Sequence, residues 1–264
     1  MSSLTDEERK ALAKKYLENC AANVEKARDR IKTYVYKTAL YRSLWLSDES
    51  TNTNVYLKME SEQITGSFKA RGAFNTICIM KETNDSLPKK NQLSITTASC
   101  GNHGLACALA MKTLEVQGKI FVPECAAEGK IEAIKKYGGK LEIYGDDCLK
   151  AETQAEKMAK VTENTVYISP YNDIQVVHGQ STVGMEIMED LPNVDSVFIC
   201  NGGGGIISGM ATYMKGKNPA VTIVSCQPSN SCVMYESCKA GKILDIPSLP
   251  TLADGAAGRV DPDA

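Results

Sequence analysis

The chain has 264 residues, of which 43% are hydrophobic and 23% are charged, and its formal net charge is −2. This length supports one large domain or two modest ones with a substantial core. The balanced charge offers no basic surface for a nucleic acid or a membrane, the polar N-terminus lacks the apolar run of a signal peptide, and no segment is apolar enough for a membrane span, so we expect a cytoplasmic protein.

The predicted elements alternate between helices and strands. Thr5 and Glu8 form a capping box, which predicts a charged helix that continues to about Arg30. Such alternation is typical of parallel strands covered by helices, so we expect an α/β fold with two open, mostly parallel sheets. The predicted strands cover 54–58, 93–97, 119–122, 140–144, 166–169, 194–200 and 221–226. The predicted later helices cover 67–80, 102–112, 128–137, 147–162, 179–190, 206–215 and 231–240.

Two turn-rich stretches, "NDSLPKKNQ" and "SPYND", suggest domain boundaries near residues 93 and 171. We therefore expect a smaller domain, residues 94–171, inserted in a larger domain made from residues 1–93 and 172–264. Ligands of such sheets bind at the carboxyl ends of the strands, which predicts a site in the cleft between the two parts.

The segment "DSVFICNGGGGIISGMATYMK" is predicted to form a strand, a glycine loop and a helix. The glycines have no side chains, so their backbone N–H groups can close on a phosphate at the positive end of the helix. A flexible linker is the alternative, but linkers seldom occupy a tight strand-to-helix turn. A nucleotide is disfavoured, because no GKS or GKT follows and Gln227 stands where a dinucleotide site has an acidic residue. The four glycines are Gly202, Gly203, Gly204 and Gly205.

Lys69 in "ITGSFKARGAF" lies near a predicted helix start. The helix dipole and any loss of water both disfavour its ammonium form there. A neutral amine forms a Schiff base with an aldehyde, and pyridoxal 5'-phosphate is an aldehyde that also carries a phosphate. Lys69 and the glycine loop would then bind opposite ends of one cofactor. From spacing alone, a solvated surface lysine remains the alternative.

Several motifs in a fixed order carry a family resemblance. The chain contains "LKMESEQITGSFKARGAFN", "TASCGNHGLACALA", "GQSTVGMEI", "CNGGGGIISGMA" and "LADG". Together they resemble the fold-type II pyridoxal-phosphate enzymes, in particular the serine/threonine dehydratases and serine racemases, over residues 36–258. The resemblance implies a tryptophan synthase β-like architecture with a smaller domain inserted in a larger one.

The resemblance also implies site residues. Lys69 would hold the cofactor and move the α-proton of the substrate, while Phe68 and Gly255 would lie along the cofactor ring. Asn102 would bind the 3-hydroxyl of the cofactor, and Gly202 to Gly205 would bind its phosphate. The substrate carboxylate would be bound by Ser99, Asn102 and His103. His178 is interpreted as a structural residue that opens a turn.

The implied reaction is dehydration and deamination of L-threonine or L-serine to a 2-oxo acid and ammonia. Amino-acid racemisation is the runner-up, and Cys100 decides between the two. It stands where similar racemases have a serine that works on the face opposite the lysine. Its thiol could deliver a proton there, or it could be a small apolar filler. Since dehydratases tolerate other residues at this position, elimination is favoured.

A divalent cation is not expected. Gln227 and Val233 stand where metal-activated relatives place a glutamate and an aspartate, and hard cations require carboxylate oxygens. A chelator such as EDTA should therefore leave thermal stability unchanged. Ten cysteines without CxxC spacing indicate reduced thiols, and two histidines are few for metal ligation.

The sequence stops at "GRVDPDA", whereas members of the family continue. That further segment carries the group that faces the pyridine nitrogen of the cofactor. A truncated, inactive homologue that serves as a binding or regulatory subunit is therefore the non-enzymatic alternative. The expected partners are a small amino-acid substrate and, by family analogy, a second copy of the chain, with no nucleic acid and no membrane.

Overall fold

The structure, a computed structural model, describes residues 6–257 and 260. Thr5 and the side chain of Glu8, which form the predicted capping box, lie outside the described part. The helices and strands follow one another as α1 (Asp6–Ile31), β1 (Leu40–Arg42), β2 (Tyr56–Lys58), α2 (Lys69–Asp85), β3 (Ser94–Ala98), α3 (Asn102–Leu114), β4 (Gly118–Val122), α4 (Glu128–Lys136), β5 (Leu141–Ile143), α5 (Cys148–Val161), β6 (Thr165–Tyr167), α6 (Ile174–Asp190), β7 (Ser196–Cys200), α7 (Gly205–Lys217), β8 (Thr222–Cys226) and α8 (Val233–Ala240). None of the described helices is long and apolar enough to cross a membrane.

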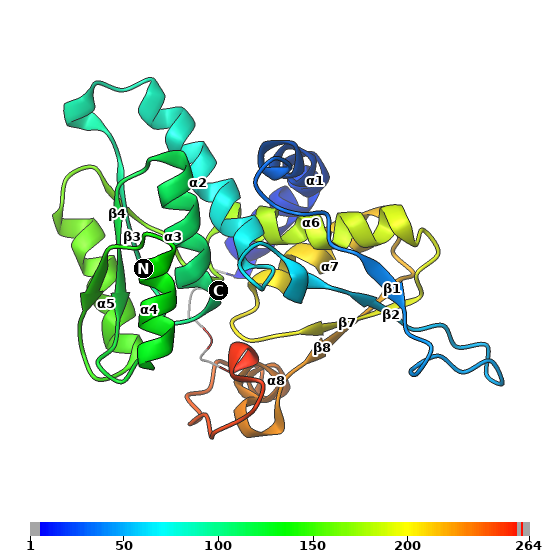
Figure 1. The fold of residues 1–264 in the computed structure, drawn as a ribbon. Coiled ribbons are helices and arrows are strands. Elements are labelled where there is room, and N and C mark those ends of the chain that lie inside the picture. The colour runs from blue at the N-terminus through cyan, green and yellow to red at the C-terminus, as the bar shows by residue number, and fades with distance from the viewer. Residues whose placement is uncertain (1–5, 258–259, 261–264) are drawn as a thin grey trace.

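The larger sheet has four parallel strands in the order β5-β4-β3-β6. Successive side chains of a strand point to opposite faces. Ile120 and Val122 of β4 accordingly join the core that contains residues of α3 and α4. Phe121 joins the smaller core that contains residues of α5. Both faces of this sheet are therefore covered by helices (Figure 1), as expected for parallel strands.

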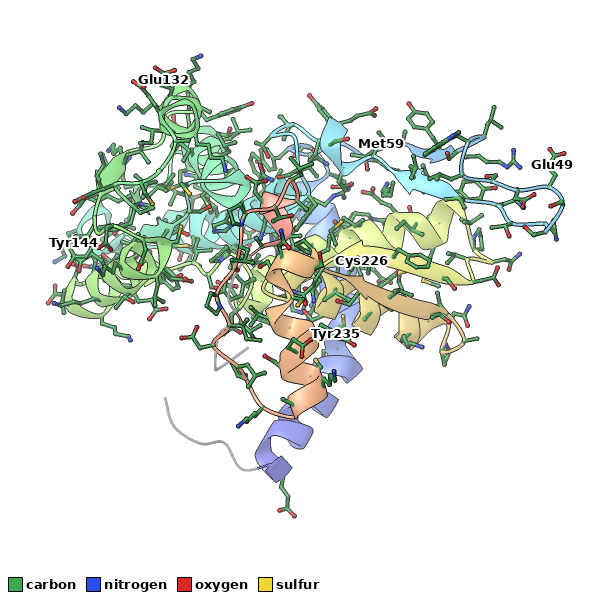
Figure 2. All side chains as sticks on the ribbon, turned by 90° about the horizontal axis from the view of Figure 1, so that it is seen from below. Glu49, Met59, Glu132, Tyr144, Cys226 and Tyr235 are labelled. Carbon is green, nitrogen blue, oxygen red and sulfur yellow. The ribbon has the colours of Figure 1, made fainter. Side chains whose placement is uncertain are left out.

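A second parallel sheet consists of β7 and β8, which pair from Ser196↔Thr222 to Cys200↔Cys226. Its core is shared with helices α1, α6 and α7. The prediction of an α/β fold with parallel sheets is thus confirmed. The antiparallel pair of β1 and β2 was not expected, because β1 has only three residues and no alternating pattern. This pair forms an arm that extends from the body, with Glu49 near its tip (Figure 2).

The observed helix starts differ from the predicted ones by two residues or fewer, except in α6. Helix α6 begins at Ile174 rather than at Gly179, because the Asp173 side chain caps it by accepting hydrogen bonds from the backbone N–H groups of Gln175 and Val176. His178 therefore lies inside a helix and does not open a turn. Helix α2 begins at Lys69 rather than at Ser67.

Helix α2 packs against α3 on one side and against α6 on the other. It therefore lies between the four-stranded sheet and the layer formed by α6 and α7 (Figure 1). The first residue of this helix is Lys69. The division into domains 1–93 with 172–264 and 94–171 stays a prediction.

Candidate active site

Lys69 is the first residue of α2 and is partly buried. Its Nζ donates a hydrogen bond of 2.7 Å to the carbonyl oxygen of Pro170 and lies 5.3 Å from the centre of the Phe68 ring. Burial lowers the pKa of Lys69 to about 8, and the nearby Cys107 opposes this shift to a smaller extent. A substantial fraction of the amine is therefore neutral, and nucleophilic, near pH 8.

The glycine loop leads directly into α7. Gly204 is the N-cap residue and has a φ of +95°, a conformation that residues other than glycine rarely adopt. A Cβ atom added at Gly203 would lie 2.5 Å from the ring of Tyr171, and one at Gly205 would lie 2.8 Å from the backbone of Tyr171. The loop thus combines bare backbone with a helix N-terminus, which is the arrangement that binds phosphate groups.

Two short segments connect the predicted site residues. Residues 170–171 connect Lys69 to the glycine loop, since Pro170 accepts the hydrogen bond from Lys69 and Tyr171 packs on the loop. Residues 255–256 connect the loop to the start of α3. A Cβ atom added at Gly202 would lie 3.6 Å from the backbone of Ala256. A Cβ atom added at Gly255 would lie 3.9 Å from Asn102 Nδ2.

The structure therefore brings together Lys69, Asn102, Gly255 and the glycine loop. Tyr171 was not identified from the sequence, where the only signal was the turn-rich stretch "SPYND". That stretch was interpreted as a domain boundary and not as part of a site.

Around the start of α3, Asn102 is exposed, Ser99 is half-buried and His103 is buried. The His103 side chain is only 2% exposed, and its Nε2 lies 3.1 Å from Thr97 Oγ1 and 3.4 Å from Cys107 Sγ. Burial, with a contribution from Lys69, lowers the pKa of His103 to about 3, so the ring is neutral. If His103 contacts a substrate carboxylate, its backbone N–H at the helix start is the available donor.

Cys100 lies in the turn between β3 and α3 and is partly exposed. Its thiol is hydrogen-bonded to that of Cys148, which lowers the pKa of Cys100 to about 6, and the positive charge of Lys130 acts in the same direction. His178 is buried in α6, and burial lowers its pKa to about 4.

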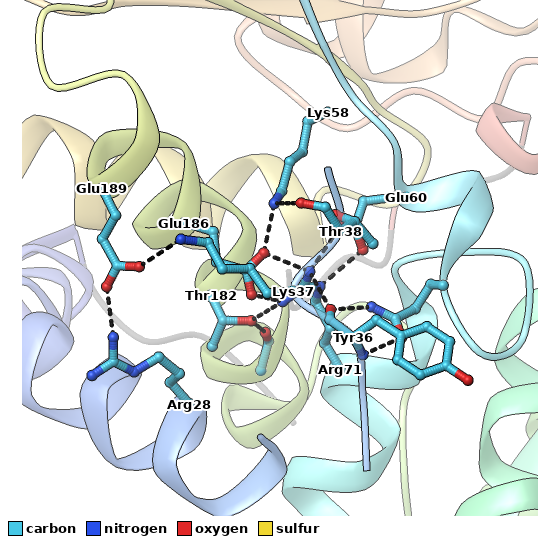
Figure 3. Close-up of polar contacts among 12 residues, drawn as sticks. Arg28, Tyr36, Lys37, Thr38, Lys58, Glu60, Arg71, Thr182, Glu186 and Glu189 are labelled. Carbon is cyan, nitrogen blue, oxygen red and sulfur yellow. Dashed lines mark hydrogen bonds and ion pairs between the residues drawn. The ribbon is translucent and has the colours of Figure 1, made fainter. Parts of the chain in front are cut away.

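A buried ion network, which we call the Arg71 network, anchors the first turn of α2 (Figure 3). Arg71 has no exposed side-chain surface and is bound by two carboxylates, at 2.8 Å from Glu60 and 2.6 Å from Glu186. Lys58 lies 2.6 Å from Glu186 and donates a hydrogen bond to the carbonyl oxygen of Thr38. Because Arg71 is two residues after Lys69, this network fixes the backbone that carries the amine. No sequence pattern pointed to the network, because its members come from four separate segments.

Gln227 and Val233 stand where metal-activated relatives place ligands, and both have structural contacts here. Gln227 Oε1 accepts a hydrogen bond of 2.8 Å from the backbone N–H of Tyr235 in the first turn of α8. Val233 is a buried core residue. In the described part of the chain, no three histidine, cysteine, aspartate or glutamate side chains are grouped to hold a metal ion.

Comparison with known proteins assigns the family. Residues 31–264 match the model of the pyridoxal-phosphate dependent enzymes. The chain belongs to this family. The resemblance inferred from the sequence motifs is thereby confirmed.

Relatives include dehydratases and racemases. The catabolic L-threonine dehydratase TdcB of Staphylococcus aureus (strain USA300) is 37% identical over 238 residues, which are 90% of this chain and 67% of that protein. Maize serine racemase is 31% identical with a TM-score of 0.81, over 91% of this chain and 71% of that chain. The processed form of threonine deaminase isoform 2 from Solanum lycopersicum is 31% identical with a TM-score of 0.80, over 93% of this chain and 69% of that chain.

Proposed function

We propose that the chain dehydrates and deaminates L-threonine or L-serine, with pyridoxal 5'-phosphate as cofactor, to give a 2-oxo acid and ammonia. The observation that carries this proposal is the Lys69 amine, whose pKa is lowered to about 8 and which is hydrogen-bonded to Pro170, the residue before the Tyr171 on which the bare-backbone loop packs. The dehydratase and deaminase among the relatives support the same reaction.

The residues of the site fit the cofactor. Lys69 would hold its aldehyde end, and the four glycines from Gly202 to Gly205 would bind its phosphate through their N–H groups. Phe68 and Gly255 would lie along the ring, and Asn102 would bind the ring hydroxyl. When bound, the cofactor supplies an electron sink for the bonds at the substrate α-carbon.

The chain itself provides binding and proton transfer. Lys69 Nζ accepts the α-proton in its neutral form, and the carbonyl oxygen of Pro170 orients the amine through its hydrogen bond. The carboxylate of the substrate would be bound at the N-terminus of α3 by Ser99, Asn102 and the backbone N–H of His103, where the helix dipole favours an anion.

Racemisation of serine is the second candidate, and Cys100 is the observation that favours it. A thiol whose pKa is lowered to about 6 exchanges a proton readily near neutral pH. In this second reaction Cys100 would act on the substrate face opposite Lys69. The variant Cys100→Ala would then lose formation of D-serine while it keeps release of the 2-oxo acid.

We propose a cytoplasmic homodimer as the working form. The homodimer rests on family analogy, and the cytoplasmic location rests on the ten cysteines without CxxC spacing or a signal sequence. Sedimentation equilibrium of the purified chain should give twice the monomer mass; a monomer at all concentrations would contradict the dimer.

The test of the main proposal is a set of assays on the purified chain mixed with pyridoxal 5'-phosphate. We expect a yellow absorbance band, release of 2-oxo acid from L-serine or L-threonine, and, after borohydride reduction, a pyridoxyl adduct on the peptide that contains Lys69. Lys69→Ala should remove all three. Lys81→Ala, an exposed lysine of the same helix, should keep them. Absence of colour in the wild type would favour the non-enzymatic alternative, a binding or regulatory subunit.

A further inference from the structure

Three cysteines follow three neighbouring strands of the larger sheet. Cys100 comes after β3, Cys125 after β4, and Cys148 after β5. These strands are adjacent and parallel, in the order β5-β4-β3. Because the carboxyl ends of parallel strands lie at one edge of a sheet, the three loops that carry these thiols meet there. The same edge contains the start of α3, where the substrate carboxylate is proposed to bind.

Two of these thiols are near enough to alter the pKa of each other. Cys100 and Cys148 are hydrogen-bonded to each other, and Cys125 lies close enough to act on Cys148 electrostatically. Cys148 is exposed and Cys100 is partly exposed, so a small oxidant can reach both. Within the described part of the chain, the three cysteines are not grouped closely enough to hold a metal ion.

The charges around the pair favour a thiolate on Cys100. Its pKa is lowered first by the hydrogen bond from Cys148 and then by the positive charge of Lys130, whereas burial and Asp254 oppose the shift. The pKa of Cys148 is raised by the same hydrogen bond, by burial and by the negative charges near it, including Asp147. Cys148 therefore keeps its proton and donates it to the hydrogen bond. A thiolate beside a thiol is the arrangement in which one sulfur is oxidised first and the other resolves it.

We propose that Cys100 and Cys148 form a modification site for peroxides, in which oxidation converts the two thiols to a reversible disulfide beside the active site. The inference goes beyond the proposed function, because it requires only the two thiols and an oxidant.

The chemistry balances with hydrogen peroxide as the oxidant. The Cys100 thiolate attacks one peroxide oxygen, the O–O bond breaks, hydroxide leaves, and Cys100 becomes a sulfenic acid. The Cys148 sulfur then attacks the Cys100 sulfur, the S–O bond breaks, and the oxygen leaves as water with the proton of Cys148. Two thiol sulfurs have lost two electrons in total, and the peroxide has gained them. A dithiol reductant reverses the reaction by exchange.

The disulfide would alter the site that it adjoins. Cys100 lies between Ser99 and Asn102 in the turn that leads into α3, and Cys148 begins α5 on the opposite face of the sheet. A bond between them ties this turn to a second helix and removes the thiol. We therefore expect oxidation to lower substrate turnover about tenfold, and a dithiol to restore it.

The decisive experiment is peptide mapping of the full chain after treatment with hydrogen peroxide, without reduction and with free thiols blocked. We expect one linked pair of peptides, containing Cys100 and Cys148, with the mass of two hydrogens lost. Cys200 and Cys238, which are exposed and distant in sequence, should stay blocked thiols and serve as internal controls. A link between Cys125 and either partner, or oxidation of Cys100 to a sulfinic acid with Cys148 unlinked, would overturn the proposal.

Matched variants separate this inference from the proposed function. Cys148→Ser should prevent the link, and because its Cys100 sulfenic acid is not resolved and goes on to a sulfinic acid, prolonged peroxide treatment should cause a loss of turnover that a dithiol does not restore. Cys125→Ser should behave as the wild type. Persistence of the reversible loss in Cys148→Ser would contradict the assignment. If the untreated chain shows no turnover, the proposed function fails, and the peptide map still decides the modification site.

Discussion

Lys69 shows how position alters the chemistry of a common side chain. Its ammonium form is disfavoured at the first residue of a helix and by partial burial, and its amine has one hydrogen-bond acceptor, the carbonyl oxygen of Pro170. No carboxylate pairs with Lys69 Nζ within 4 Å among the described residues. The low pKa thus follows from desolvation without a compensating ion pair.

This environment predicts the pH dependence of cofactor capture. The pKa of Lys69 is lowered from 10.5 to about 8, so the neutral fraction rises as the pH increases through 8. At pH 8 about half of the amine is neutral, compared with about 1 in 300 for an unperturbed lysine. Borohydride trapping measures the initial rate at which pyridoxal 5'-phosphate is incorporated, and the rate of Lys69→Ala is subtracted as background. The pH profile of the remaining rate should have its midpoint near pH 8. A midpoint near 10.5 would show that the amine is solvated.

The glycine loop gives a second prediction at the scale of single residues. Gly203→Ala should weaken cofactor binding about tenfold or more, because the new Cβ would lie 2.5 Å from the Tyr171 ring and force the ring or the loop to move. Gly216→Ala, in the helix α7 that follows the loop, is the control, since a Cβ there meets no atom within 4 Å. It should leave binding unchanged and stabilise the chain by about 0.5–1 kcal/mol. Absorbance titration and thermal unfolding measure both effects, and equal affinities of the two variants would contradict the role of Tyr171.

At this scale the sequence identified the residues whose identity alone reveals a function. A lysine near a helix start and a run of four glycines after a strand are rare without a reason. The burial of the His103 ring and the packing of Tyr171 on the glycine loop could not be predicted, because both depend on the tertiary structure around them. Only tertiary packing determines them.

At the scale of elements, the Arg71 network holds the start of α2. Two cations, Arg71 and Lys58, are paired with two carboxylates, Glu60 and Glu186. The charges are balanced and nearly all are buried, so each group depends on the others. Removing a single member leaves an uncompensated buried charge. The free-energy cost of that charge is larger than the net stabilisation that the intact ion pair provides.

We therefore predict that Arg71→Met lowers the free energy of unfolding by about 3–5 kcal/mol, because Glu60 and Glu186 would lose their common partner. Lys81→Met on the same helix removes an exposed pair with Asp85 and should have little effect. Urea unfolding followed by circular dichroism measures the difference. Equal stability of the two variants would mean that water or another cation replaces Arg71.

Elements with a strong local signal were predicted well, and weak ones were not. Six of the helices after α1 begin within two residues of the expected position, whereas α6 begins five residues earlier because Asp173 of "SPYND" caps it. Strand β1 has three residues, and its existence depends on pairing with β2 rather than on its own sequence. Short edge elements of this kind are determined by their partners.

At the scale of the whole molecule, the site is assembled from segments far apart in the chain. Lys69 and Pro170, Gly203 and Tyr171, and Asn102 and Gly255 meet there, and α2 joins the two layers that carry them. A cofactor bound at this point would contact residues from both layers. It would therefore stabilise the native arrangement as a whole and not a single loop.

This argument predicts a global stabilisation by pyridoxal 5'-phosphate. A ligand that binds only the native state stabilises it by about 2.7 kcal/mol when its free concentration is 100-fold above Kd. For a chain of this size that corresponds to a rise in Tm of about 5–10 °C. The rise should be the same when unfolding is followed by far-UV circular dichroism and by differential scanning calorimetry, since both layers must separate for the cofactor to leave. With Lys69→Ala the rise should be much smaller, because covalent attachment is lost while the phosphate still binds. A full-sized rise in that variant would mean that the phosphate loop alone supplies the affinity, and that Lys69 does not hold the cofactor.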